Sequence, residues 1–136
     1  MKITLSEHAT IPERAHKYDA GLDLCSTENA EIPPYSFVTV GTGVGVELPI
    51  GTVGLLTSKS GLMAKQGITT RGTIDCGYTG EIRVTLFNHS GKWRYIEKGQ
   101  KVSQLVVLPA LLPTVEIVDK LDETERGCNG FGSTGK

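Results

Sequence analysis

The sequence predicts an all-β fold, either a compact barrel or a jelly-roll-like sandwich, and three observations support this prediction. Several segments alternate apolar and polar residues with the period of two that a β-strand requires. Glycine accounts for 17 of the 136 residues and is spread along the chain together with six prolines, which indicates many tight turns. Only residues 61–67, GLMAKQG, have room for a helical turn or two. Short alternating segments joined by such turns are typical of barrels and sandwiches.

The expected strands follow the alternation in chain order. In VTVGTGVGVEL, residues 38–48, five of the six even positions are apolar, whereas the odd positions hold threonine, glycine and glutamate. EIRVTL, residues 81–86, repeats this pattern, and three more segments follow it less regularly, at residues 52–57, 101–108 and 114–118. We therefore expect strands in all five segments.

The composition favours one soluble domain. We expect residues 1–136 to form a single domain, because the chain is long enough for one core and too short for two ordinary ones. Hydrophobic residues are 38% and charged residues 21%, which excludes the disordered class, and a net charge of −1 provides no general attraction to nucleic acid or acidic membranes. The N-terminal MKITLSEHAT lacks the apolar stretch of a signal peptide. Cys25, Cys76 and Cys128 match neither a disulfide framework nor a zinc site, so we expect a cytoplasmic protein.

Two aspartates stand within otherwise apolar segments. Asp23 lies in AGLDLCS and Asp75 lies in GTIDCGYTGEI, and both segments contain glycine. A carboxylate among strand residues is costly to bury unless it is paired, binds a metal or has a function. Either aspartate alone is also explained by a turn or a solvent-facing position, so both interpretations stay open on these residues alone.

Two further segments offer groups that bind anions. In TSKSGLMAKQG, Lys59 and Ser60 precede Gly61 and a possible helical turn, so a cation, hydroxyls and N–H groups come together. The tail GCNGFGSTGK follows Arg126 and contains Phe131. Arginine binds phosphate through two parallel hydrogen bonds, and an aromatic ring can stack on a nucleobase. A solvated serine-rich turn and a flexible tail are the alternatives for these two segments.

In their order along the chain and in their residues, these segments resemble the five motifs of the trimeric deoxyuridine triphosphatase (dUTPase) family. The resemblance extends over nearly the whole chain. The counterparts of motifs one to five are AGLDL at 20–24, SKSGL at 58–62, GTIDCGYTGEI at 72–82, GQKVSQ at 99–104 and ERGCNGFGSTG at 125–135. Lys59 stands where the family commonly has arginine, which keeps the charge but not the planar fork of donors.

The resemblance implies a β jelly-roll subunit of a homotrimer, with active sites built from several subunits. It also implies a mobile C-terminal arm, residues 126–136, that closes over bound nucleotide. The implied reaction is hydrolysis of dUTP to dUMP and pyrophosphate by attack of water on the α-phosphorus, with Mg²⁺ as cofactor. Such an enzyme limits uracil in DNA and supplies dUMP for thymidylate synthesis. The implied partners are dUTP and two further copies of the chain, without nucleic acid or membrane.

The resemblance also implies roles for individual residues. Asp75 is the expected catalytic base that orients and deprotonates the attacking water. Asp23 is the expected metal residue, which holds Mg²⁺ through water, and Tyr78 is the expected steric check against a ribose 2′-hydroxyl. Main-chain groups of a tight hairpin around GITTRGTI, residues 67–74, are expected to read the uracil. The other expected substrate-binding residues are Lys59, Ser60, Gly61 and Gln104 at the α and β phosphates, Arg126, Ser133 and Thr134 at the γ-phosphate, Phe131 stacked on uracil with Gly132 beside it, Thr69, Gly72, Thr73 and Ile74 in the hairpin, and Arg83.

Two alternatives stay open at this point. A relative of the dCTP deaminases would share the jelly roll but convert the base, and the tail motif fits a triphosphatase better. A regulatory protein could instead use nucleotide occupancy of the arm as a switch for binding a partner. Against this, the chain has no obvious insertion that could form a partner-binding module. Release of ammonia would indicate a deaminase, and release of pyrophosphate would indicate a triphosphatase. A pull-down with and without a non-hydrolysable dUTP analogue tests the regulatory alternative.

Overall fold

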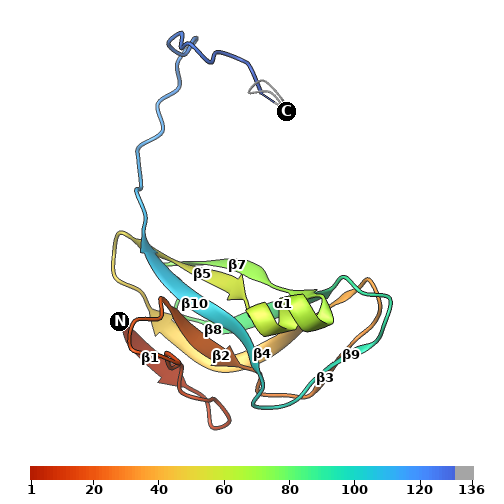
Figure 1. The fold of residues 1–136 in the computed structure, drawn as a ribbon. Helices are drawn as coiled ribbons and strands as arrows, with labels where there is room; N and C mark the ends of the chain where they lie inside the picture. The colour runs from red at the N-terminus through yellow and green to blue at the C-terminus, as the bar shows by residue number, and fades with distance from the viewer. Residues whose placement is uncertain (131–136) are drawn as a thin grey trace.

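Two four-stranded sheets and a two-stranded ribbon, all with antiparallel pairing, make up the computed structural model, which describes residues 1–130 (Figure 1). The first sheet has the order β1-β4-β8-β6 and consists of β1 (Lys2–Leu5), β4 (Phe37–Glu47), β8 (Glu81–Asn88) and β6 (Ile68–Thr69). The second sheet has the order β2-β10-β5-β7 and consists of β2 (Gly21–Cys25), β10 (Lys101–Pro109), β5 (Thr52–Ser58) and β7 (Arg71–Asp75). The ribbon pairs β3 (Ala30–Ile32) with β9 (Arg94–Ile96). The prediction of an all-β fold is confirmed.

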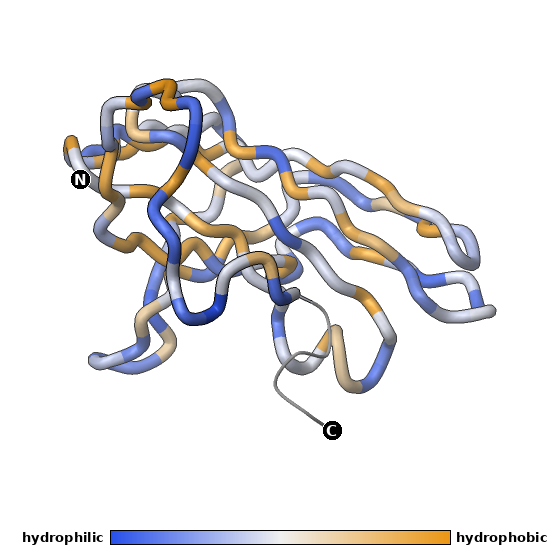
Figure 2. Tube along the Cα trace, turned by 90° about the horizontal axis from the view of Figure 1, so that it is seen from above, coloured by the Kyte–Doolittle hydropathy of each residue, from blue (hydrophilic) through white to orange (hydrophobic). Residues whose placement is uncertain are grey.

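One hydrophobic core lies between the sheets, as the alternation predicts. Hydrophobic and hydrophilic residues alternate along much of the trace in Figure 2. Each fully buried aliphatic side chain contributes roughly 1.5–3 kcal/mol relative to an exposed one. The innermost side chains come from both sheets and the ribbon, and they include Val40, Val44, Ile82, Val84, Leu86, Leu24, Leu105, Ile32 and Ile96.

A bulge in β4 leaves this alternation intact. Gly41 pairs with Arg83 and Gly45 pairs with Glu81, so β4 carries two more residues than β8 over this stretch. Because the excess is even, the apolar side chains on either side of the bulge stay on the core face. Gly43 lies within the bulge at φ 67°, a value that favours glycine. The strands expected at residues 38–48 and 81–86 are therefore confirmed as β4 and β8.

The one helix of the described chain is the predicted short one. Helix α1 (Ser60–Gln66) ends at Gly67, which adopts a left-handed conformation and donates its N–H to the carbonyls of Leu62 and Met63. This glycine satisfies carbonyls that the helix end would otherwise leave unpaired. Leu62 packs into the core, which fixes the helix against the sheets. Within residues 1–130 no helix is long and apolar enough to cross a membrane.

After β10 the chain leaves the sheets, and Figure 1 shows this segment in blue rising away from the body. Every residue from 111 to 130 is exposed and none belongs to a strand. The strand expected at 114–118 is therefore wrong for the single chain, because no neighbouring strand offers its segment hydrogen-bond partners. Val115 and Ile117 are 87% and 96% exposed. Phe131, Gly132, Ser133 and Thr134, which the sequence implicated in binding, lie outside the described residues.

Candidate functional site

A hollow of about 270 Å³ lies where the chain passes from β7 in one sheet to β8 in the other. Its lining combines the residue expected to be the base, the residue expected to check the sugar, and part of the expected uracil site. The lining residues are Thr73, Ile74, Asp75, Tyr78, Glu81, Ile82 and Arg83. Five of these seven are expected from the sequence, and Glu81 and Ile82 are not.

Tyr78 forms a fixed wall of this hollow. Its backbone N–H donates to the Asp75 carbonyl at 3.0 Å, which closes the turn after β7. Its hydroxyl donates to the Glu81 carbonyl at 2.9 Å, so the ring lies across the turn. A Cβ at Gly80 would sit 2.7 Å from the Tyr78 hydroxyl oxygen, and glycine is therefore required there. The ring is 46% exposed, which leaves part of it available to a ligand.

Asp75 presents a carboxylate that has no competing partner among the described residues. The residue is exposed at the end of β7, where its backbone pairs with Val53. Within residues 1–130 its side chain makes no hydrogen bond and no ion pair. A carboxylate in this state has all its lone pairs available to accept a proton or a hydrogen bond from water.

Arg83 lines the same hollow, but its guanidinium faces acidic side chains. It lies 3.7 Å from Glu81 and 3.8 Å from Glu28, and it donates to the Thr39 carbonyl at 3.4 Å. The carboxylates of Glu28 and Glu81 also accept N–H groups of the β4 bulge, at 2.9 and 2.8 Å. In the single chain Arg83 therefore braces the bulge at the edge of the hollow.

The hairpin expected at residues 67–74 is wrong. Strand β6, with Thr69, pairs with β8 in the first sheet, whereas β7, with Gly72, Thr73 and Ile74, pairs with β5 in the second. The segment therefore crosses from one sheet to the other. Thr69 lies apart from the hollow, and its hydroxyl is hydrogen-bonded to the His89 ring at 2.7 Å.

A second group of expected residues surrounds Asp23. The Asp23 side chain is 4% exposed, and its Oδ1 lies 2.5 Å from the Lys59 Nζ and 3.2 Å from the Gln104 Nε2. Its Oδ2 lies 2.7 Å from the Lys101 Nζ. We call Asp23, Lys59, Lys101 and Gln104 the Asp23 cluster. The sequence implicated three of its members but not Lys101.

The partners of Asp23 keep it ionised. Burial on its own raises the pKa of this carboxyl, but the hydrogen bonds from Lys101, Lys59 and Gln104 outweigh that effect, and the pKa is lowered from its usual 3.8. The same contact raises the pKa of Lys101. Asp23 is therefore a carboxylate, and Lys101 is an ammonium ion, at neutral pH.

Gln104 reaches Asp23 because a glycine lies beneath it. Gly21 and Asp23 lie two residues apart on β2, so their side-chain positions share one face. A Cβ at Gly21 would lie 2.9 Å from the Gln104 Cβ. The side chain of Gln104 can lie flat over this position only if it is glycine.

The start of α1 adjoins this cluster. Lys59 is the residue before the helix, and Ser60 and Gly61 form its first turn and are exposed. The first N–H groups of a helix have no partner within it. Ser60, Gly61 and the Lys59 ammonium group can therefore all donate hydrogen bonds to one anion.

The hollow and the Asp23 cluster are far apart in a single chain. Asp23, Gln104, Thr57 and Arg71 form one row across β2, β10, β5 and β7. Asp75 lies at the far end of β7 from this row. With about 4.8 Å between strands and about 3.3 Å per residue, Asp75 lies roughly 20 Å from Asp23.

The residues around Asp23 fit a metal ion only in a limited way. Asp23 is the one carboxylate of the cluster, and both its oxygens face ammonium groups. No three His, Cys, Asp or Glu side chains of residues 1–130 come together to hold a metal. Mg²⁺ keeps several waters and takes ligands from substrate phosphates. These residues therefore fit Mg²⁺ only as an ion that takes its ligands from phosphates and water, with Asp23 as the one carboxylate of the cluster.

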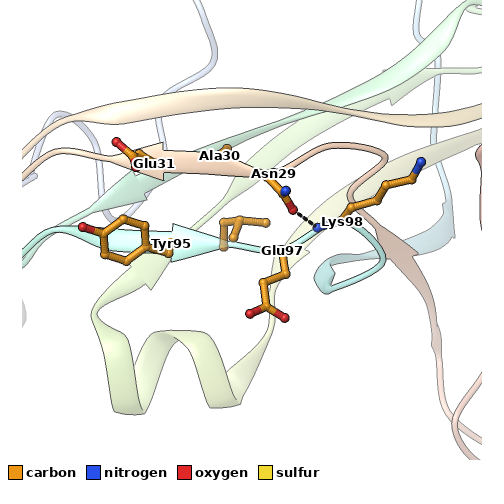
Figure 3. A pocket seen from close by; sticks show the side chains of 7 residues that line it. Asn29, Ala30, Glu31, Tyr95, Glu97 and Lys98 are labelled. Carbon is orange, nitrogen blue, oxygen red and sulfur yellow. Dashed lines mark hydrogen bonds between the residues drawn. The ribbon is translucent and has the colours of Figure 1, made fainter.

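A larger hollow of about 540 Å³ lies on the β3–β9 ribbon and contains none of the expected residues. Its lining includes Glu31, Tyr95 and Glu97, whose side chains spread along the ribbon without converging on one point (Figure 3). The backbone N–H of Lys98 donates to the Asn29 side chain at 2.8 Å, which links the two strands at one end of the ribbon. The arrangement provides no catalytic combination of groups.

Arg126 is exposed in the segment beyond β10, where its Nε donates to the Asn129 carbonyl at 3.2 Å. This segment rises away from the sheets in Figure 1, and none of its residues lines the hollow. The structure thus brings the expected residues together in two groups and leaves Arg126 and Thr69 outside both.

Solved dUTPase structures have a fold similar to that of this chain. A dUTPase from Staphylococcus bacteriophage 80alpha, solved with dUPNHPP, superposes with a TM-score of 0.92 and 33% identity over 99% of this chain and 98% of its own. A dUTPase variant from phage phi11 of S. aureus has a TM-score of 0.81 and 32% identity over 88% of this chain and 96% of its own. It is described as revealing the coordination of a structural Mg(II) ion.

Sequence relatives carry the same family name. The deoxyuridine 5′-triphosphate nucleotidohydrolase of Clostridium tetani is 46% identical over 97% of this chain and 93% of that protein. Its counterpart in Nocardia farcinica is 47% identical over 92% of this chain and 78% of that protein. The dUTPase family model matches residues 7–135. The chain therefore belongs to the dUTPase family.

Proposed function

We propose that this protein hydrolyses dUTP to dUMP and pyrophosphate. Membership in the dUTPase family supports the reaction, as do the nucleotidohydrolase names of its relatives. The observation that carries the proposal for this chain is the hollow that brings together the Asp75 carboxylate, which has no partner within residues 1–130, and the fixed ring of Tyr78. The deaminase and regulatory alternatives are not favoured, because relatives at 46% and 47% identity are named as hydrolases.

In the proposed reaction Asp75 accepts a proton from water, and the resulting hydroxide attacks the α-phosphorus. The bond between the α-phosphorus and the bridging oxygen breaks, and pyrophosphate leaves. A positioned general base typically contributes about 10²–10⁴-fold to the rate. The absence of any competing partner for Asp75 within residues 1–130 supports this role.

Tyr78 is the proposed check on the sugar. The ring cannot swing away easily, because its hydroxyl is hydrogen-bonded to Glu81 and its backbone closes the turn. A 2′-hydroxyl pressed against such a wall has neither space nor a hydrogen-bond partner, and an unpaired buried hydroxyl is costly. Backbone groups of Thr73 and Ile74, beside Tyr78 in the same hollow, are the proposed uracil contacts, with Gly72 and Arg83 at its margin.

The phosphates are proposed to bind at the start of α1 and at the Asp23 cluster. Lys59, Ser60 and Gly61 donate to the α and β phosphates together with Gln104. Arg126, Ser133 and Thr134 donate to the γ-phosphate, and Phe131 stacks on the uracil with Gly132 beside it. When bound, Mg²⁺ would supply positive charge to the phosphates. Asp23 would hold one of its waters.

The distance between the two groups of residues supports an oligomer. Asp75 must reach the α-phosphorus, and Lys59 must reach the phosphate beside it, yet the two groups lie roughly 20 Å apart by strand spacing. One molecule of dUTP therefore needs Asp75 from one copy and the Asp23 cluster from another.

Exposed apolar strand edges point the same way. Ile3 and Leu5 of the edge strand β1 are 39% and 42% exposed, and Val115 and Ile117 are more exposed still. The unpaired backbone groups of an exposed edge strand can pair with a strand of another molecule, and exposed apolar side chains can be buried against it. The proposed assembly is a homotrimer, as the family resemblance implies, with the residues beyond β10 reaching a neighbouring copy.

The proposed setting is the cytoplasm, where the reaction would limit uracil in DNA and supply dUMP for thymidylate synthesis. Hydrolysis in H₂¹⁸O tests the chemistry. Attack on the α-phosphorus places the label in dUMP, and mass spectrometry of both products should detect it there alone. Label in pyrophosphate would mean attack on the β-phosphorus. In a parallel reaction with dCTP, ammonia release and label in the base would mean deamination.

A further inference from the structure

Asp23 is in contact with two ammonium groups where one would neutralise it. Lys59 lies 2.5 Å from Oδ1 and Lys101 lies 2.7 Å from Oδ2. The three groups together carry one excess positive charge. A buried carboxylate needs compensation for lost hydration, but Lys59 and Gln104 on Oδ1 already supply part of it. The second lysine makes the cluster as a whole positively charged.

A β-bulge directs Lys101 into this cluster. Residues 101 and 104 are three apart, so a regular strand would place their side chains on opposite faces. In β10 the pairing runs Lys101 with Cys25, Ser103 with Leu24 and Gln104 with Asp23, so that β10 has one residue more than β2. The extra residue brings Lys101 and Gln104 to the same face. Bulges often re-aim a side chain next to a functional site.

The two lysines are partly exposed to solvent, whereas their carboxylate is almost fully buried. The side chains of Lys59 and Lys101 are 23% and 54% exposed, and that of Asp23 is 4% exposed. An ammonium group has three donor protons; Lys59 donates one to Asp23 Oδ1, and Lys101 meets Oδ2 as an ion pair. Several charged donors therefore remain on the open side of the cluster, where a polyanion can accept them.

From this geometry we infer that Lys101 is a second phosphate-binding cation and that Asp23 positions both lysines before nucleotide arrives. The inference rests on the proposed function, since the anion it names is the triphosphate chain of the substrate. Lys59 and Lys101 contact opposite oxygens of one carboxylate, so their ammonium groups can bind neighbouring phosphates. Asp23 fixes two flexible side chains, which lowers the entropy that phosphate binding must otherwise overcome.

Replacement of Lys101 tests this inference. Lys101→Met removes the charge and keeps the aliphatic stem, Lys101→Arg restores a cation, and Lys98→Met is the matched control. Lys98 is an exposed lysine in the neighbouring turn, and its ammonium makes no ion pair within residues 1–130. Calorimetry would measure the affinity for a non-hydrolysable dUTP analogue with and without Mg²⁺, and NMR titration would measure the affinity for deoxyuridine, which has no phosphate.

We expect Lys101→Met to weaken binding of the analogue by about tenfold or more, as for loss of a charged hydrogen bond, and to leave deoxyuridine affinity within about twofold. Lys101→Arg should recover most of the loss, and Lys98→Met should behave as wild type. Should Lys101→Met not fold, Lys101→Gln takes its place with the same expected loss.

Unchanged analogue affinity in the Lys101 variant would overturn the inference. So would equal losses for the analogue and for deoxyuridine, which would indicate a structural role for Lys101. Wild-type protein that binds neither compound would instead contradict the proposed function.

Discussion

Replacing Asp75 with asparagine removes the proposed base and almost nothing else. The side chain keeps its size but loses the charge that accepts the proton from water. Loss of a general base lowers turnover by about 10²–10⁴-fold, which corresponds to about 3–5 kcal/mol of transition-state stabilisation. We expect kcat for pyrophosphate release to fall by this factor, while the affinity for a non-hydrolysable dUTP analogue stays within about threefold of wild type.

The structure also predicts that Asp75→Asn leaves stability unchanged. Asp75 is exposed and its side chain makes no hydrogen bond or ion pair within residues 1–130. Surface substitutions of this kind change the free energy of unfolding by at most about 0.5 kcal/mol, or roughly 2 °C in Tm. Calorimetry and stopped-flow kinetics on the same preparation separate the two effects. A variant that keeps more than about a tenth of the wild-type kcat would refute the role of Asp75.

Three further predictions concern the sugar check, the C-terminal segment and the Asp23 cluster. Tyr78→Ala should lower the dUTP-to-UTP ratio of kcat/KM by roughly tenfold or more, whereas Tyr78→Phe, which keeps the ring, should not; equal ratios in all three proteins would exclude Tyr78 as the check. Deletion of residues 126–136 should nearly abolish hydrolysis without changing Tm or oligomeric state, because residues 126–130 are exposed; full activity after deletion would contradict their role. Asp23→Asn should cost roughly 1–3 kcal/mol of stability at pH 7, a buried-pair value reduced for the exposure of Lys101. Because the pKa of Asp23 is lowered from 3.8, its contribution persists above that pH and is lost as the pH falls through the lower folded value. The Tm difference between wild type and Asp23→Asn should therefore shrink in acid, and a difference that grows would contradict this linkage.

The strands with regular alternation could be predicted from the sequence, but their neighbours could not. The bulge in β4 adds two residues, an even number, so it moves no apolar side chain off the core face. The alternation of residues 38–48 therefore still predicted a strand. At residues 67–74 the turn residues were visible, but nothing local indicates which sheet each short strand joins. Strands β6 and β7 pair with β8 and β5, and these pairings depend on residues far away in the chain.

The candidate site divides in the same way. Asp75 and Tyr78 lie within one turn, so their closeness in space could be predicted from the sequence. Asp23, Lys59 and Gln104 meet only through the pairing of β2, β10 and β5, and the family motifs alone indicated that they belong together. Lys101 lay within a quoted motif and was still missed, because strand alternation places residues 101 and 104 on opposite faces unless a bulge intervenes.

The measurement that tests the central claim most directly is pyrophosphate release from dUTP, UTP, dCTP and dTTP by the full-length protein, with and without Mg²⁺. We predict that dUTP is hydrolysed to dUMP and pyrophosphate in equal amounts, that kcat/KM is at least about 10²-fold lower for each of the other three, and that removal of Mg²⁺ slows the reaction. Hydrolysis of all four nucleotides at similar rates, or ammonia release from dCTP in place of pyrophosphate release from dUTP, would contradict the account.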